Sequence, residues 1–505
     1  MARLRAPLVL APTRDEVAGV VGGLLRDGWR LAVLAANEDV PGRRGATTDG
    51  FRIVYAFLRA GGPDGLGERA EVTLTLTRED AWYPSLASLS FSSERFEREV
   101  RDLFGIAVHD HPQPYRLTRH HNWPTGYYPM RSDADPAPVF DANHPFPFVE
   151  ISGDGVYEIP VGPIHAGLIE PGHFRFTVVG ESILQMRFRL WFMHRGLEKL
   201  FEGRSPQAGI ALAERISGDT AVGHGLAYVL AVEDAAGIVV DERSRMIRAL
   251  LLELERLYNH VGDLGAIVND VGYGIAKSHC DALKEELLRH NKRLTGHRLL
   301  RGGVLLGGAR LLAAPEASLV CQIADRADEV ARVALEHPIV DNRVVDQAIL
   351  PRETAVAFGA LGYVARASGV VTDARAEHPF VDLGEHFQVV TERVGDVRAR
   401  FEVRRRELAV SARLVADLTE RLASLPETAP ADWTPHAGAG LGVVEGWRGT
   451  IVHRVELDAD GLVARLKPVD PSFFNWPAIG PALTDTIVPD FPLCNKSFNA
   501  SYAGN

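Results

Sequence analysis

The chain has 505 residues, and its 55 Lys and Arg against 66 Asp and Glu give a formal net charge of −11. This length predicts two to four domains, and a composition of 46% hydrophobic and 24% charged residues is typical of globular proteins, which excludes wholesale disorder. The negative charge argues against a general nucleic-acid coat, and three cysteines without a CxxC pair exclude a disulfide framework or a cluster held by four cysteines.

The first part of the chain has the pattern of a small α+β unit. Helical spacing of apolar residues predicts a helix over 13–27 with Thr13 as its N-cap. Strands are expected over 30–35, 51–58 and 71–77, followed by a helix over 92–103. The segment 110–147 is crowded with Pro, His and aromatic residues, which predicts an extended tail. We place the first domain at 1–145.

The second domain, 146–505, is predicted to be mainly helical. Apolar residues recur with the helical period over 205–236, 246–261, 279–300, 314–336, 353–367 and 386–425. Strands are expected over 449–456 and 463–467, before an irregular tail. The expected fold class is therefore an α+β N-terminal domain followed by a mainly α domain, a bundle of long helices with small β elements. No window approaches the roughly 18 apolar residues of a transmembrane helix, so we expect a chain that is soluble or peripheral on a membrane partner.

Two sets of motifs carry a family resemblance. The first is the run Glu-Arg-Glu-Val-Arg-Asp-Leu-Phe-Gly-Ile at 97–106, followed by His111-Pro112, Trp123-Pro124 and Tyr128-Pro129-Met130-Arg131. This set resembles the signature of the small hydrophilic subunit of respiratory complex I, the C or 30-kilodalton type.

The second set extends through the rest of the chain. It comprises Gly-Pro-Ile-His-Ala-Gly at 162–167, His-Arg-Gly-Leu-Glu-Lys at 194–199, and further motifs within 226–233, 253–260, 366–375 and 448–449. These motifs resemble the quinone-site (D) subunit of complex I and, more closely, the large subunits of membrane-bound nickel-iron hydrogenases. A C-like domain fused ahead of a D-like one is the layout of the formate-hydrogenlyase and hydrogenase-4 large subunits.

The resemblance also implies where a nickel centre would lie. Four cysteines hold nickel in such hydrogenases, and the corresponding positions here are Ser217, Thr220, Ser501 and Gly504. Nickel-iron centres need soft thiolates, which hydroxyls or an absent side chain do not replace, and Cys494 is the only thiol close in sequence. We therefore expect no working nickel-iron site and no metal ligands in this chain.

The D-subunit resemblance implies two candidate catalytic residues, His165 and Asp270. They match the quinone-site His and the carboxylate that pairs with it, whereas the quinone-binding Tyr falls on Gly218. A turn histidine and a helix-end carboxylate remain the alternatives. Arg448 resembles the arginine that overhangs the hydrogenase metal and equally fits a structural ion pair. The residues expected to line the cavity are Arg215, Ser217, Gly218, Thr220, Arg448, Ser501 and Gly504.

The resemblance implies a large subunit of a membrane-associated, complex I-related oxidoreductase. It would pass electrons from an iron–sulfur partner to a quinone or another small acceptor, without a nickel-iron centre. The implied partners are a small iron–sulfur subunit holding a 4Fe-4S cluster and antiporter-like membrane subunits, with no nucleic acid. The implied location is the cytoplasmic side of the membrane.

No Gly-rich nucleotide loop appears in a strand-to-helix setting, so NAD, if used, binds another subunit. We expect no cofactor bound by this chain alone, with quinone as a possible substrate. Two alternatives remain open. One is a redox-inactive scaffold of a hydrogenase-4-like complex, and the other is a hydrogenase with an unusual metal site.

Overall fold

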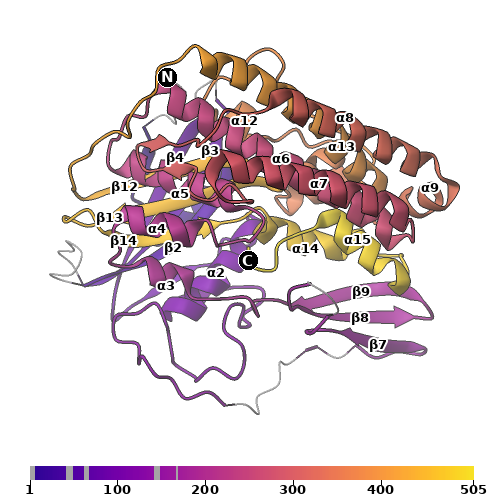
Figure 1. Cartoon of the computed structure of the whole chain (residues 1–505). Helices are drawn as coiled ribbons and strands as arrows, with labels where there is room; N and C mark the ends of the chain where they lie inside the picture. The colour runs from indigo at the N-terminus through magenta and orange to yellow at the C-terminus, as the bar shows by residue number, and fades with distance from the viewer. Residues whose placement is uncertain are drawn as a thin grey trace.

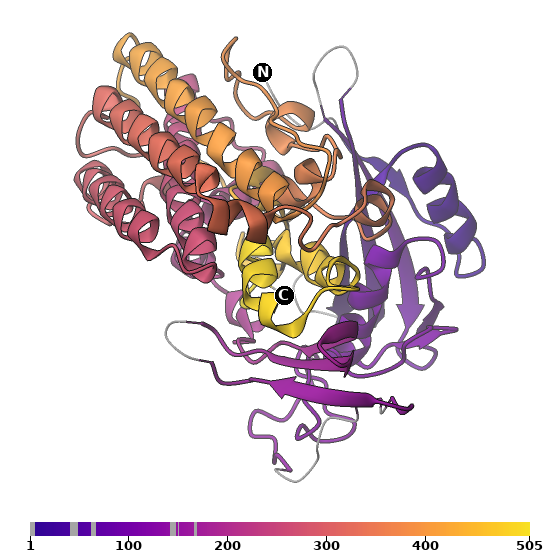
Figure 2. The same cartoon turned by 90° about the vertical axis from the view of Figure 1, so that its right-hand side faces the viewer.

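The structure is a computed structural model that describes residues 6–40, 49–61, 67–141, 148–149, 151–165 and 169–504. Long helices form a bundle on one side of the molecule, and the N-terminal sheet lies on the other (Figures 1 and 2). The C-terminal segment lies where these two parts meet a third, smaller sheet (Figure 2). The expected fold class, an α+β domain followed by a mainly helical one with small sheets, is confirmed.

The N-terminal part is built around a four-stranded sheet of order β1-β4-β3-β2. Its elements are β1 (Leu8–Leu10), α1 (Val17–Arg26), β2 (Arg30–Asp39), β3 (Gly50–Arg59), β4 (Glu68–Thr77) and α2 (Phe91–Phe104), together with the parallel pair β5 (Trp82–Pro84) and β6 (Ala107–His109). The three expected strands and the second helix are confirmed. Helix α1 begins four residues after Thr13, because Thr13 forms a turn held by the Glu16 carboxylate, with its N–H and hydroxyl at 2.9 and 2.8 Å.

The extended tail is confirmed where the structure describes it. Residues 110–141 contain no helix or strand, while 142–147 lie outside the described residues. A three-stranded antiparallel sheet follows, made of β7 (Val156–Val161), β8 (His173–Val179) and β9 (Ser182–Arg189). Sequence analysis missed this sheet, although Phe174, Phe176 and Val178 alternate with polar residues and are fully buried.

The helical part contains the bundle α6, α7, α8 and α13 and several shorter helices (Figure 1). The helices are α3 (Leu197–Phe201), α4 (Pro206–Ala213), α5 (Ala221–Ala235), α6 (Glu242–Asp270), α7 (Gly274–Thr295), α8 (Ala317–Glu336), α9 (Pro338–Val344), α10 (Arg352–Ala357), α11 (Gly362–Ala367), α12 (Ala374–Glu377) and α13 (Val397–Ala423).

Three expected helices differ from the structure. The helix over 205–236 is interrupted by the loop 214–220, and the helix over 353–367 is split where Gly359 and Gly362 adopt positive φ angles of 68° and 62°. The helix over 386–425 begins only at Val397, where the Asp396 carboxylate accepts the Ala399 N–H at 2.7 Å and so caps it.

The C-terminal part is more regular than expected. It contains the antiparallel sheet β12 (Gly438–Gly446), β13 (Gly449–Leu457) and β14 (Val463–Val469), and then α14 (Ser472–Ala482), a 3₁₀ turn (Val488–Asp490) and α15 (Phe491–Phe498). The two-residue strands β10 (Val304–Leu305) and β11 (Gly308–Ala309) lie earlier in the chain, between α7 and α8. The prediction of an irregular tail was wrong. Two prolines, Pro477 and Pro481, lie inside α14.

The two parts share an interface between sheets. Arg465 on β14 donates to the Ala36 carbonyl on β2 at 3.0 Å, and the Glu456 carboxylate on β13 accepts from Asn37 at 2.7 Å. Beneath these contacts, Phe96 of α2 stacks on Phe473 with ring centroids 4.3 Å apart. The interface is thus continuous with the hydrophobic core. Within the described ranges, no helix has the length and apolar character needed to cross a membrane.

Candidate functional site

The site forms where the loop between α4 and α5 meets the C-terminal tail. The Ser217 Oγ lies 2.9 Å from the Ser501 Oγ, and both side chains are buried. The tail is held from its own side, because the Ser501 N–H donates to the Ser472 hydroxyl at 2.8 Å and its carbonyl accepts from the Trp476 indole at 2.9 Å. Two positions predicted to face each other are therefore in direct contact.

An ion pair between Asp219 and Arg448 lies beside the two serines. The Arg448 guanidinium donates to both oxygens of Asp219 at 2.7 and 2.6 Å. It also donates to the Thr220 hydroxyl at 3.2 Å and to the Asn499 carbonyl at 2.6 Å. Ser217 and Thr220 donate to the same carboxylate at 3.1 and 3.0 Å. One guanidinium thus connects the loop, the β12–β13 turn and the tail.

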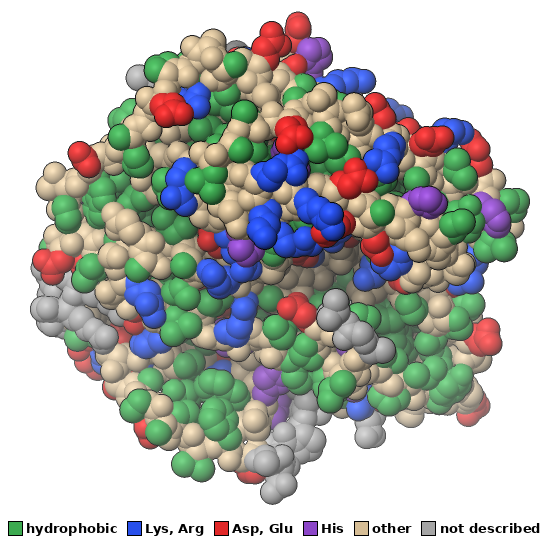
Figure 3. Space-filling model, viewed as in Figure 1, with side chains coloured by type: hydrophobic (Ala, Val, Ile, Leu, Met, Phe, Trp, Pro, Cys, Tyr) green, Lys and Arg blue, Asp and Glu red, His purple; other side chains and the backbone are tan. Residues whose placement is uncertain are grey.

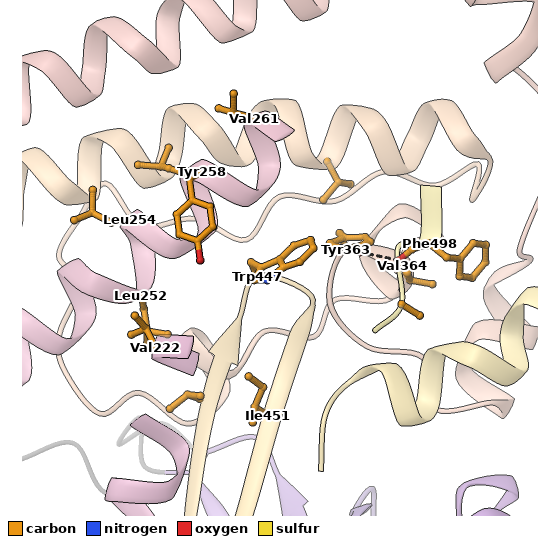
Figure 4. Close-up of a cluster of buried hydrophobic side chains, with 14 of the residues drawn as sticks. Val222, Leu252, Leu254, Tyr258, Val261, Tyr363, Val364, Trp447, Ile451 and Phe498 are labelled. Carbon is orange, nitrogen blue, oxygen red and sulfur yellow. Dashed lines mark hydrogen bonds between the residues drawn. The ribbon is translucent and has the colours of Figure 1, made fainter. Parts of the chain in front are cut away.

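Aromatic side chains form the floor of this network. Trp447, at the tip of the β12–β13 hairpin, lies between Tyr258 and Tyr363 (Figure 4). Its indole donates to Thr220 at 3.1 Å, the Tyr258 hydroxyl donates to the Asp219 carbonyl at 3.2 Å, and the Tyr363 hydroxyl donates to the Phe498 carbonyl at 2.7 Å. The three rings thereby fix both the loop and the start of the tail.

The site is buried on the side of Arg448 and open to solvent on the side of Gly218 and Arg215. The Arg448 side chain is 5% exposed, whereas that of Asp219 is 40% exposed, and Gly218 and Arg215 lie on the surface. Burial opposes ionisation of Asp219, but the Arg448 charge and the hydrogen bonds from Arg448, Thr220 and Ser217 lower its pKa to about 2. Asp219 is therefore a carboxylate at neutral pH. On the face viewed in Figure 3, Lys and Arg side chains gather around a hollow near the centre.

Gly504 does not join the two serines but packs against a second set of hydrogen-bonded side chains, Asp470, His224 and His453. A Cβ added to Gly504 would lie 2.6 Å from the Asp470 carboxyl carbon. Asp470 is bonded to His224 Nε2 at 2.9 Å, and His224 Nδ1 lies 3.0 Å from His453 Nε2. Burial and the neighbouring His224 lower the pKa of His453 well below its usual range, so this ring is neutral.

A cavity of about 60 Å³ extends from Gly504 toward the N-terminal domain. Apolar rings form part of its wall, including Phe96, Trp191 and Phe473. Its polar lining includes His194, His224, Asp470, Glu99, Glu198 and Lys467. A cavity of this size admits water and is lined by groups that can exchange protons.

His165 and Asp270 are not hydrogen-bonded to each other. The His165 Nε2 lies 2.8 Å from the Gly172 carbonyl oxygen, and Asp270 is the last residue of α6. Burial raises the pKa of Asp270, while Lys496 and Lys277 oppose that rise. The predicted His–Asp pair is therefore absent from the described residues, and the two catalytic roles stay predictions.

The donor set does not fit a nickel-iron centre. Three positions offer neutral hydroxyls, the fourth has no side chain, and the Ser217 and Ser501 oxygens bond to each other. Cys494 is buried in α15, where burial raises the pKa of its thiol to about 12, so it is not a thiolate. In the parts of the chain that the structure covers, no group of three or more His, Cys, Asp or Glu side chains is placed to hold a metal.

Several motif residues form a buried structural network rather than a site. The Arg366 guanidinium donates to Glu445 at 2.9 Å and to Glu407 at 2.7 Å, and His260 lies 2.7 Å from the second oxygen of Glu407. Arg375 joins the same network through Glu253 at 3.0 Å. These side chains connect α6, α11, α12, α13 and β12, so the motifs are explained by packing.

Sequence reasoning missed Asp219, Asp470 and His224. Asp219 stands between two positions that were selected, and the arginine at 448 was the available signal that a carboxylate would face it. Asp470 and His224 lie 246 residues apart, and only the fold brings them together.

Family models match successive parts of the chain. The model described as "Respiratory-chain NADH dehydrogenase, 30 Kd subunit" matches residues 15–138, and that described as "Respiratory-chain NADH dehydrogenase, 49 Kd subunit" matches 270–434. The model described as "Nickel-dependent hydrogenase" matches residues 195–262, which include Ser217 and Thr220.

Whole-chain comparisons agree with these matches. Formate hydrogenlyase subunit 5 of Escherichia coli is 33% identical over 83% of this chain and 76% of its own length. Hydrogenase-4 component G of the same organism is 30% identical over 94% of this chain and 83% of its own length. A subunit of the membrane-bound sulfane sulfur reductase, an archaeal respiratory membrane complex, has the same fold, with a TM-score of 0.63 at 23% identity, covering 70% of this chain and 98% of that one. The chain therefore belongs to the family of fused complex I C/D-type (30- and 49-kilodalton) subunits that includes formate hydrogenlyase subunit 5 and hydrogenase-4 component G.

Proposed function

We propose that this chain is the large subunit of a membrane-associated, complex I-related oxidoreductase that works without a nickel-iron centre. It receives electrons from a 4Fe-4S cluster in a small iron–sulfur partner and passes them to a quinone or another small acceptor. Antiporter-like membrane subunits complete the assembly, any NAD is bound on another subunit, and the chain lies peripherally on the cytoplasmic side of the membrane. Membership of the family supports the assembly, and the site geometry supports the acceptor.

The observation that carries this proposal is the Asp219–Arg448 pair beside Ser217 and Ser501. The positions that correspond to the nickel ligands of related hydrogenases contribute to a charged, hydrogen-bonded network rather than to a cluster of apolar side chains. Its upper edge is open at Gly218 and Arg215. An acceptor bound at this edge meets the Asp219 carboxylate, which the buried Arg448 guanidinium holds in place and which can orient a small polar group.

Proton supply follows from the groups near this edge. The cavity from Gly504 contains His194, His224 and Asp470, a set that can pass protons toward the site. His165 and Asp270 remain proposed proton donors, and burial raises the pKa of the Asp270 carboxyl group above its usual value. The alternative of a scaffold subunit predicts that none of these side chains affects turnover.

The test uses the complex isolated from native membranes through a tag on this chain, with its subunits identified by mass spectrometry. Recovery of an iron–sulfur subunit and antiporter-like proteins supports the assembly. The complex is then assayed for reduction of decylubiquinone and for hydrogen evolution, both with reduced methyl viologen as donor. Asp219→Asn and His165→Ala are compared with Arg332→Gln, a change in an exposed ion pair on α8. If either variant loses quinone reduction while the complex still assembles, the proposal is supported. If both variants turn over like the parent, the chain is a scaffold subunit.

A further inference from the structure

A second pocket lies at the opposite end of α5 from Thr220. Its volume is about 230 Å³, and its lining includes Arg245, Arg248, His378, Ile238, Phe380 and Leu441. The walls come from the C-terminal end of α5, the first turns of α6, the segment after α12 and strand β12. Helix α5 has 15 residues and spans about 22 Å, so this pocket is separate from the Asp219–Arg448 site.

His378 is the unusual member of the lining. The residue is only 5% exposed, yet neither ring nitrogen has a hydrogen-bond partner among the described residues. The ring packs on Gly67, where an added Cβ would lie 1.9 Å from Nδ1. Burial and the nearby Arg30 charge lower its pKa to about 3, so the ring is neutral and offers one N–H donor and one acceptor. Buried polar atoms without partners are rare in folded proteins.

Two carboxylates line the pocket, but Glu233 pairs with Arg248 and Asp234 pairs with Arg69, which leaves Arg245 without a carboxylate partner among the described residues. Arg248 is fully engaged, with two hydrogen bonds to Glu233 and two more to the Gly308 and Leu305 carbonyls. Arg245 is half-buried, and its contact is a long one, 3.4 Å from Nε to the Asp241 carbonyl oxygen. The Asp241 carboxylate accepts the Ser244 N–H, and within the described ranges it forms no ion pair with Arg245.

We propose that this pocket binds a small carboxylic acid with an apolar body and a second polar group. The carboxylate pairs with Arg245, the second group bonds to His378, and the body packs between Ile238, Phe380 and Leu441. The carboxylate supplies Arg245 with a counter-charge, and the second polar group supplies the buried His378 ring with a hydrogen-bond partner. The inference is independent of the proposed redox role, because it uses none of the residues of that site.

The test is calorimetric titration of the purified full chain with 3-phenylpropanoate, phenylpyruvate and 4-methyl-2-oxopentanoate. The expected result is saturable one-to-one binding of at least one acid, with 3-phenyl-1-propanol not binding because it lacks the charge. Arg245→Gln is expected to weaken binding by about tenfold or more, whereas Arg332→Gln leaves it unchanged. His378→Phe is expected to weaken the binding of phenylpyruvate, which has a keto group, more than the binding of 3-phenylpropanoate.

The arms of this test separate the possible results. If none of the three acids binds to a purified chain that is shown by thermal unfolding to be folded, the proposal is overturned. It is also overturned if the alcohol binds as tightly as the acid, or if Arg245→Gln binds like the parent. Because Arg245 is half-buried on the first turns of α6, we expect Arg245→Gln to fold even if the buried His378→Phe does not. Binding to Arg245→Gln therefore decides the question alone.

Discussion

The Ser217 hydroxyl lies 2.9 Å from the Ser501 hydroxyl, although 284 residues separate them in the chain. One belongs to the loop between α4 and α5, and the other to the tail beyond α15. The contact shows that the tail closes over the loop and brings together two of the four positions that correspond to metal-binding cysteines in related hydrogenases.

Removing either serine hydroxyl is expected to loosen the tail. Ser217→Ala leaves the Ser501 hydroxyl buried without this partner, at a cost of about 1 kcal/mol, and the same holds for Ser501→Ala. Because the two changes remove one shared bond, the double variant is expected to cost less than the sum. Hydrogen exchange of the Ser501 amide measures local opening directly. Strict additivity of the two changes would contradict the contact.

The Asp219–Arg448 pair predicts an asymmetry between its two members. Asp219→Asn leaves a guanidinium that is 5% exposed without its counter-charge, whereas Arg448→Gln leaves a carboxylate that water reaches, since Asp219 is 40% exposed. We expect Asp219→Asn to be the more destabilising, by about 2–3 kcal/mol after allowance for this exposure.

Thermal unfolding of the two variants, and of Arg332→Gln as an exposed control, measures the difference. The control is expected to change stability by less than about 0.5 kcal/mol. Arg448→Lys is expected to restore little, because a compact ammonium cannot reproduce the planar pairing with both Asp219 oxygens together with the bonds to Thr220 and Asn499. Equal effects of the two pair variants would show that the pair is solvated at both ends.

Local sequence patterns predicted the helices and strands better than they predicted the tertiary contacts between them. The alternation over 71–77 corresponds to β4, which has one buried face, and the apolar stripe over 246–261 corresponds to α6, although α6 is buried on every side over these residues. The helix over 205–236 was wrong because the loop 214–220 is held by distant residues, Arg448 and Ser501, that no local pattern contains. The same holds for α14, where tertiary packing around Trp476 outweighs two prolines.

The candidate site was predictable in part. Motif positions selected Ser217, Thr220, Arg448 and Ser501, which the structure brings together. The expected His165–Asp270 bond does not form, because Asp270 ends α6 while His165 bonds to Gly172. Spacing along the chain identifies the elements of a site, and side-chain pairing depends on how those elements pack.

Glu97 is expected to make stability depend on pH. It is fully buried, with one oxygen accepting the Leu86 N–H at 2.7 Å and the other 2.6 Å from the Ser85 hydroxyl. Burial raises its pKa from 4.5 to about 7, although these hydrogen bonds oppose the rise. The folded chain therefore binds this proton more tightly than the unfolded chain. This contribution to stability is complete below pH 4.5 and is lost as the pH rises through 7.

Glu97→Gln removes this dependence and keeps the geometry. The amide oxygen accepts the Leu86 N–H, and the amide group donates to Ser85. The variant is expected to match the parent near pH 4.5 and to exceed it by about 1–3 kcal/mol at pH 8. Melting temperatures across this range provide the measurement. A constant difference between variant and parent would mean that Glu97 does not titrate there.

Lys467 is expected to control how firmly the two domains hold together. Its ammonium lies 2.7 Å from Glu99 on α2 and 3.0 Å from Glu198 on α3, and all three groups are buried. Glu198 also pairs with Arg465 at 2.6 Å, so Lys467→Met leaves Glu99 as the unpaired charge. We expect a loss of about 3–5 kcal/mol, and faster proteolysis within the extended segment 110–141. Adding Glu99→Gln removes that charge, so the double variant is expected to recover much of the loss. If it unfolds like Lys467→Met alone, the loss comes from the missing contact between the Lys467 Nζ and the Phe96 ring, 5.9 Å apart, rather than from the stranded carboxylate.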